Sequence, residues 1–178
     1  MGTPDIVWVL LETELGNIEV AVDRARAPIT AANFLHYVDA DCYNGGRFHR
    51  TVTPDNQPND TIRIEVIQGG VDPARKGERN PPIPLERTTV TGLAHRDGAI
   101  STARFAPDSA VSDIFICIGD QPTLDFGGLR NPDGQGFAAF GEVVAGMDVV
   151  RAIQGQPADG QSLAPPIAIT SARRIARL

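Results

Sequence analysis

Three short strings place polar side chains inside or beside apolar, strand-like runs. They span residues 47–52, 66–70 and 113–118 and read RFHRTV, VIQGG and DIFICI. Polar groups that are buried cost free energy unless they find partners. We therefore expect these strings to line a cleft, where their polar side chains have partners or a function, rather than to lie on an ordinary surface.

Arg50 and Gln68 are the principal candidates for chemistry. Arg50 alternates with Phe48 and Val52, so a regular strand would place all three side chains on one face. Gln68 continues the alternation of the apolar residues before it. An arginine on an apolar face needs a partner or a function. The pattern predicts that Arg50 and Gln68 share a partly buried region and bond to each other.

Other chemistries have weaker support in the sequence. The three histidines are too dispersed to predict a metal site, and they are His36, His49 and His95. A Ser-His-Asp hydrolase is an alternative, but no G-x-S-x-G motif occurs among the serines that would serve it, which are Ser101, Ser109 and Ser112. We expect no metal and no cofactor.

Length and composition limit the remaining function classes. At 178 residues the chain fits one domain, residues 1–178. A net charge of -6 with scattered basic residues argues against a nucleic-acid partner. The longest apolar run, residues 6–11, is too short for a membrane span, so no membrane partner is expected. A cytoplasmic location is expected, or a periplasmic one if a signal peptide has been removed. Cys42 and Cys117 leave the redox compartment open.

Strand signals dominate the chain. Alternation and β-branched residues predict strands at residues 6–12, 17–23, 48–52, 62–68, 99–102, 114–118, 138–144 and 167–175. Helices are predicted at residues 28–43, with Thr30 as N-cap, and at residues 146–154. Polar, turn-rich loops fall at residues 53–60, 71–84 and 122–136. Many short strands with two helices favour a closed or nearly closed β architecture whose long loops carry function.

An ordered set of motifs resembles the cyclophilin family of peptidyl-prolyl cis-trans isomerases. The strings FHR, QGG, FIC, LD and FGEVVAGMDVV follow one another in that order, and the likeness runs from about Val7 to the C-terminus. The resemblance implies a mainly β fold, a closed eight-stranded antiparallel barrel capped by two α-helices. It also implies an exposed groove that binds Xaa-Pro peptides and catalyses rotation about the Xaa-Pro bond.

The resemblance also assigns roles to individual residues. Arg50 looks like the catalytic arginine, with His49 and Gln68 in support. The substrate-binding residues that it implies are Val66, Ala103, Arg104, Phe105, Asp113, Phe115, Leu124 and Phe137. The expected partners are proline-containing peptides and unfolded or folding proteins, and the expected state is a monomer.

Some groove positions depart from the family pattern. Asp113 replaces a glutamine, Phe137 falls where a histidine is common, and Arg104 replaces an asparagine. Thr123 stands where many members carry a tryptophan, which predicts weak cyclosporin binding. These departures leave a second hypothesis open, a non-catalytic module that binds proline-containing peptides or acts as a chaperone on the same fold.

Overall fold

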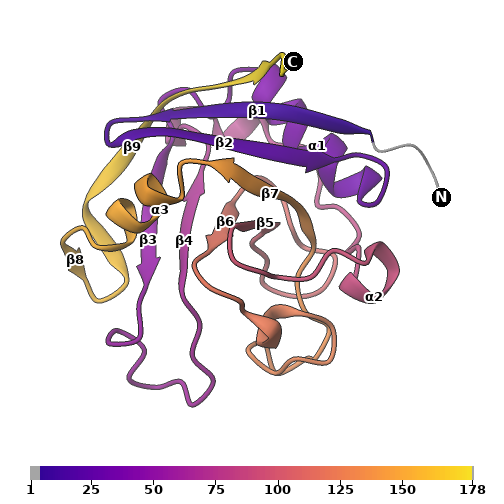
Figure 1. Cartoon of the computed structure of the whole chain (residues 1–178), viewed down its shortest axis with the longest axis vertical. Helices are drawn as coiled ribbons and strands as arrows, with labels where there is room; N and C mark the ends of the chain where they lie inside the picture. The colour runs from indigo at the N-terminus through magenta and orange to yellow at the C-terminus, as the bar shows by residue number, and fades with distance from the viewer. Residues whose placement is uncertain (1–4, 178) are drawn as a thin grey trace.

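Residues 5–177 are described by the computed structural model of the chain, and the nine strands in this range form one continuous sheet (Figure 1). The strands are β1 (Ile6–Thr13), β2 (Gly16–Asp23), β3 (Arg47–Val52), β4 (Val66–Gly70), β5 (Ala99–Thr102), β6 (Ile114–Cys117), β7 (Ala139–Ala145), β8 (Ala158–Asp159) and β9 (Ser162–Ile175). The helices are α1 (Pro28–Asp39), α2 (Thr88–Thr91) and α3 (Met147–Gln154), with 3₁₀ helices η1 (Pro73–Glu78) and η2 (Pro122–Leu124).

The sheet closes on itself. Its neighbours run β1-β2-β7-β5-β6-β4-β3-β9, and β9 also pairs with β1. Every pairing in this ring is antiparallel. The two-residue strand β8 adds to β9 outside the ring. This confirms the expected eight-stranded antiparallel barrel, in which closure removes the free edges that would otherwise invite aggregation.

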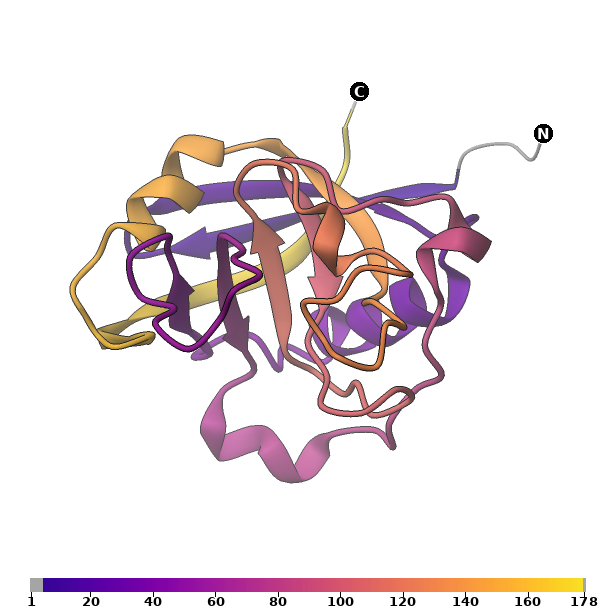
Figure 2. The ribbon, with the colours of Figure 1, turned by 90° about the horizontal axis from the view of Figure 1, so that it is seen from below.

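The barrel interior holds the main hydrophobic core. Along β2, Ile18, Val20 and Val22 alternate with more exposed residues and are each 0% exposed. Phe34 from α1 and Ile153 from α3 join the same core, and the two helices lie on opposite sides of the barrel (Figures 1 and 2). These are the two capping helices that the sequence predicts.

Helix α1 begins at Pro28 as predicted, but its N-cap and its C-terminal end differ from the prediction. Its N-cap is Ala27, not Thr30. The backbone N–H and the hydroxyl of Thr30 both donate to Glu86 Oε1 at 2.6 Å, so a distant carboxylate satisfies the first turn. The helix ends at Asp39 rather than residue 43, because Asp41 adopts a left-handed φ of 58° that stops helical propagation.

Two strands begin several residues away from their predicted starts. β4 begins at Val66 instead of residue 62, because the Gln57 side chain takes both backbone groups of Ile64, at 2.8 and 3.0 Å. This binds the segment to its own loop instead of to a neighbouring strand. β9 begins at Ser162 and runs through Pro165, where the missing N–H argues against a strand from sequence alone.

Three further observations concern a membrane span, a metal site and the two cysteines. None of the helices in residues 5–177 is long and apolar enough to cross a bilayer. No group of three His, Cys, Asp or Glu residues within that range is arranged to hold a metal ion. Cys42 and Cys117 are free thiols, both buried.

Candidate active site

A groove of about 640 Å³ lies outside the barrel core, against β3, β4 and β6. All the site residues predicted from the sequence line it except His49: Arg50, Val66, Gln68, Ala103, Arg104, Phe105, Asp113, Phe115, Leu124 and Phe137. The sequence reasoning missed the rest of the lining: Ile64, Val71, Lys76, Arg79, Ser109, Val111, Ser112, Arg130, Asn131 and Pro132. Most of the missed residues come from loops, where no periodicity marks which side chains face inward.

Arg50 reaches the groove because β3 contains a bulge. The register between β3 and β4 shifts between Phe48 and Arg50. Phe48 is 0% exposed in the barrel core, whereas Arg50 pairs with Gln68 and lines the groove. The expectation that Arg50 shares a face with Phe48 is therefore wrong, since the extra residue of a bulge reverses the alternation. Val52, after the bulge, packs with Val66 and Phe115 on the groove side. The expected bond between Arg50 and Gln68 is confirmed.

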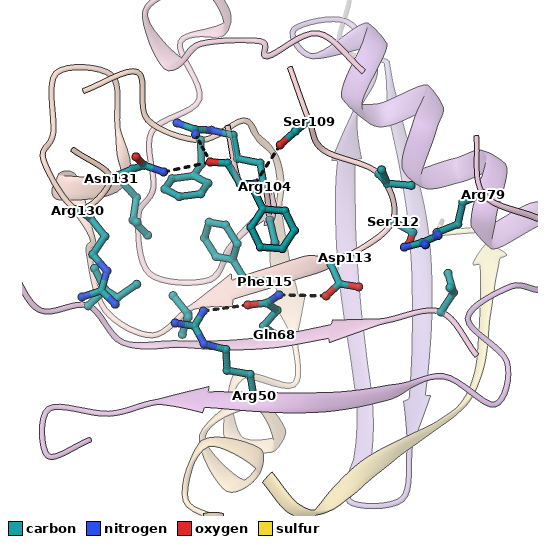
Figure 3. Close-up of a pocket in the computed structure, with 18 of the residues that line it drawn as sticks. Arg50, Gln68, Arg79, Arg104, Ser109, Ser112, Asp113, Phe115, Arg130 and Asn131 are labelled. Carbon is teal, nitrogen blue, oxygen red and sulfur yellow. Dashed lines mark hydrogen bonds between the residues drawn. The ribbon is translucent and has the colours of Figure 1, made fainter. Parts of the chain in front are cut away.

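Neutral amides hold the Arg50 guanidinium. Its Nε donates to Gln161 Oε1 at 2.9 Å. Its Nη1 donates to Gln68 Oε1, also at 2.9 Å (Figure 3). Burial lowers the pKa of Arg50, and the positive charge of Arg130 lowers it further, yet an arginine remains protonated. Within residues 5–177 Arg50 forms no ion pair with a carboxylate. Its positive charge thus remains available to a bound molecule.

Gln68 connects Arg50 to a carboxylate. Its Nε2 donates to Asp113 Oδ2 at 3.0 Å, and His49 Nε2 lies 3.0 Å from the same oxygen. Burial raises the pKa of Asp113, but the hydrogen bonds from His49 and Gln68 outweigh it and leave this pKa below its usual value. The His49 side chain is 41% exposed and stands beside the groove rather than in its lining.

An apolar pocket adjoins this polar row. Phe115 is 5% exposed and packs in one cluster with Val66 and Leu124. The ring of Phe137 meets Phe115 edge-on, with centroids 5.5 Å apart and planes at 89°. Phe115 lies between the row of Arg50, Gln68 and Asp113 and the loop that carries Arg104 (Figure 3). The groove therefore offers an apolar surface within reach of a fixed positive charge.

A buried Ser-His-Asp arrangement supports Phe115 from behind. The His95 ring stacks on Phe115 at 5.8 Å, its Nδ1 lies 2.7 Å from Asp125 Oδ1, and its Nε2 lies 2.9 Å from Ser101 Oγ. Ser101 is 0% exposed, His95 is 1% exposed, and neither lines the groove. A catalytic nucleophile must reach its substrate, so this arrangement gives the hydrolase hypothesis no accessible serine.

Arg104 joins two loops at the rim. Its guanidinium pairs with both oxygens of Asp133, at 2.9 and 3.1 Å, donates to Gly136 O and lies 4.7 Å above the Phe137 ring. Its side chain is therefore occupied within the protein. Phe105, by contrast, is 93% exposed, while its backbone N–H donates to Ser109 Oγ at 3.0 Å. A fixed backbone presents this ring at the groove rim.

The loop of residues 53–60 and the loop of residues 122–136 extend from one end of the barrel (Figure 1) and are bonded together. Arg130 donates to Gln57 Oε1 at 2.9 Å and to Ile62 O at 2.7 Å, and pairs with Asp60 at 3.3 Å. Gln57 is 1% exposed. The second loop thus lines one end of the groove through Arg130, Asn131 and Pro132, and the first loop holds Arg130 in place.

Comparison with known proteins explains the arrangement. Residues 8–174 match the family model for cyclophilin-type peptidyl-prolyl cis-trans isomerases. The chain belongs to this family. It is 37% identical over 150 residues to the peptidyl-prolyl cis-trans isomerase of Acinetobacter baylyi, covering 84% of this chain and 72% of the relative. It is 33% identical over 148 residues to peptidyl-prolyl cis-trans isomerase B of Escherichia coli, covering 83% and 84%.

Solved structures show the cyclophilin fold. A crystal structure of a Cryptosporidium parvum cyclophilin-type isomerase matches with a TM-score of 0.77 at 19% identity, covering 98% of this chain and 100% of that one. A second structure of the same protein, determined in the presence of the dipeptide Ala-Pro, matches with a TM-score of 0.75 at 20% identity, covering 96% and 99%. The chain thus has the cyclophilin fold, in agreement with its membership of the family.

Proposed function

We propose that the groove binds proline-containing segments of unfolded or folding proteins and that Arg50 catalyses rotation about their Xaa-Pro bonds. The observation that carries this proposal is the position of Arg50, which neutral partners hold beside the apolar pocket of Phe115. The proline ring would contact Phe115, Val66 and Leu124, and the carbonyl side of the bond would be free to rotate. The relative determined with Ala-Pro supports a proline-containing ligand.

The chemistry requires only differential binding. A peptide bond resists rotation because its amide is conjugated, with a barrier of roughly 18–20 kcal/mol. At the twisted transition state conjugation is lost and the proline nitrogen gains a basic lone pair. A guanidinium near that nitrogen binds the twisted state more strongly than the planar one, which is the condition for catalysis. No bond is made or broken, so no nucleophile has to act.

Gln68 and Gln161 hold the guanidinium in place without neutralising it. A carboxylate in direct contact would bind the same N–H groups and cancel the charge that the transition state needs. Amide oxygens hold Arg50 through two bonds of 2.9 Å and leave the charge in place. Preorganised donors of this kind avoid the cost of reorganisation during the reaction.

Replacing Arg50 by alanine tests the proposal. We expect Arg50→Ala to lower kcat/KM for an Xaa-Pro peptide about 100-fold, the effect of removing one preorganised donor. The rate is measured by protease-coupled isomerisation or by NMR exchange. Arg24→Ala is a matched control, since Arg24 is a surface residue paired with Asp5. A fully active Arg50→Ala protein would contradict the assignment.

The second candidate is a non-catalytic module that binds proline-containing segments. Its support is the set of departures from the family pattern in the groove, among them Asp113 and Phe137. Peptide binding by the wild-type protein, seen by NMR titration without acceleration of exchange, would favour this candidate over catalysis.

A further inference from the structure

Asp113 lines the groove and lies within hydrogen-bond distance of two other side chains. Its Oδ2 receives hydrogen bonds from Gln68 Nε2 and from His49 Nε2, each at 3.0 Å. One carboxylate oxygen is thus shared by a groove residue and by a side chain outside the lining. These bonds restrict how the carboxylate can turn toward a peptide.

The chemistry of the two neighbours fixes the Gln68 amide in one orientation. Arg50 has only donors, so it requires the amide oxygen, and an ionised Asp113 has only acceptors, so it requires the amide nitrogen. Reversing the amide would set donor against donor at Arg50 and acceptor against acceptor at Asp113. A glutamine without Asp113 would lose half of this constraint, and its oxygen would no longer be held toward Arg50.

Gly70 and His49, from two paired strands, confine Asp113 itself. The backbone at Gly70 lies so close to Asp113 Oδ1 that a Cβ at position 70 would overlap it. His49 holds Oδ2 from the other strand of the β3–β4 pair. The second glycine of the QGG string therefore makes room for this carboxylate, and the FHR string supplies its second donor.

We propose that Asp113 is a positioning residue for Arg50 that acts through Gln68, and that His49 positions Asp113. The inference rests on the proposed function. The carboxylate of Asp113 orients the amide of Gln68, and this amide orients the guanidinium of Arg50. The carboxylate and the guanidinium do not touch each other. The row runs from Arg50 through Gln68 to Asp113 in Figure 3.

A double-mutant cycle tests this directly. We expect Asp113→Ala to lower kcat about tenfold, the effect of one hydrogen bond to a charged group, with little change in KM. In a Gln68→Ala background the same change should lower kcat less than twofold, because the residue it acts through is gone. Asp113→Asn keeps an acceptor oxygen and should fall between the wild type and Asp113→Ala. Asp148→Ala, at an exposed position of helix α3 that does not line the groove, is the matched control.

A second measurement does not depend on activity. The side-chain amide protons of Gln68, followed by ¹H–¹⁵N NMR, should move toward their free-solvent positions in Asp113→Ala and stay unchanged in Asp148→Ala. This readout also separates a loss of positioning from a loss of folding, since the backbone amide spectrum reports the fold.

The outcomes separate the inference from the proposed function. Equal losses from Asp113→Ala with and without Gln68, a rise in KM alone, or an unmoved Gln68 amide would each overturn the positioning role and leave isomerisation by Arg50 standing. A wild-type protein without isomerase activity would overturn the proposed function and the inference together.

Discussion

Two histidine–aspartate pairs flank the groove, and their surroundings differ. His95 lies 2.7 Å from Asp125, with side chains 0% and 23% exposed. His49 lies 3.0 Å from Asp113, with side chains 41% and 39% exposed. The first pair stacks behind Phe115 and also engages Ser101, while the second borders Gln68 and solvent.

The two histidine–aspartate pairs should therefore have different roles. Solvent screens the His49–Asp113 pair, so it contributes little to folding, and its importance comes from what Asp113 touches. The His95–Asp125 pair is enclosed, so its hydrogen bonds act at low dielectric and leaving one unmade is costly. We expect the enclosed pair to determine stability and the open pair to determine rate.

Removal of the enclosed imidazole should have the largest effect on the free energy of unfolding. His95→Ala should lower the free energy of unfolding by about 3 kcal/mol, because it leaves a cavity behind Phe115 and removes the partner of Ser101 and Asp125. His49→Ala should change it by less than about 1 kcal/mol while lowering kcat several-fold. Urea unfolding measures the first quantity and the isomerisation assay the second.

The exposed His36 provides the control for both variants, and His36→Ala should leave stability within about 0.5 kcal/mol of the wild type. Equal losses of stability from His95→Ala and His49→Ala would contradict the division between the pairs.

Many of the barrel strands can be predicted from the sequence, because the alternation of apolar and polar residues along a strand follows its buried and exposed faces. Ile18, Val20 and Val22 predict a strand with one buried face, and the structure buries all three. Arg50 and Gln68 stand out for the same reason, as polar residues within apolar runs. The family resemblance adds the ring order and the groove, which no local pattern contains.

What the sequence does not predict depends on contacts between distant segments. The bulge between Phe48 and Arg50 depends on how β3 meets β4 and β9. Gln161 holds Arg50 from 111 positions away, and no spacing rule links the two residues. His95 is isolated in the sequence, and only the fold brings Asp125 to its ring.

Lowering the pH should reduce the stability that each histidine–aspartate pair contributes, and the reduction should be larger for the enclosed pair. Burial raises the pKa of Asp125, but hydrogen bonds from the His95 ring and backbone outweigh it and leave this pKa below its usual value. A carboxyl whose pKa is lower in the folded state adds stability above its unfolded pKa of about 3.9, and this stability is lost as the pH falls through the folded pKa. Asp125→Asn, which lacks the charge, should therefore be less stable than wild type at pH 7, with a gap that closes below about pH 4.

The pKa of Asp113 is lowered as well, so Asp113→Asn should show a gap of the same sign. The gap should be smaller than for Asp125→Asn, because solvent screens this carboxylate. Urea unfolding at a series of pH values measures both gaps. A gap for Asp125→Asn that stays constant from pH 7 to pH 3 would contradict the role given to this carboxylate.

The least intrusive comparison leaves the protein unaltered and distinguishes the two rings by tautomer. An ionised carboxylate only accepts hydrogen bonds, so the ring nitrogen facing it must carry the proton. That nitrogen is Nε2 in His49 and Nδ1 in His95, whose Nε2 then accepts from the Ser101 hydroxyl. Long-range ¹H–¹⁵N correlation at about pH 9, where an ordinary imidazole is neutral, should show opposite tautomers. If His49 exchanged between both tautomers, Asp113 would lack the second donor that holds its Oδ2, and only Gln68 would keep that oxygen in place.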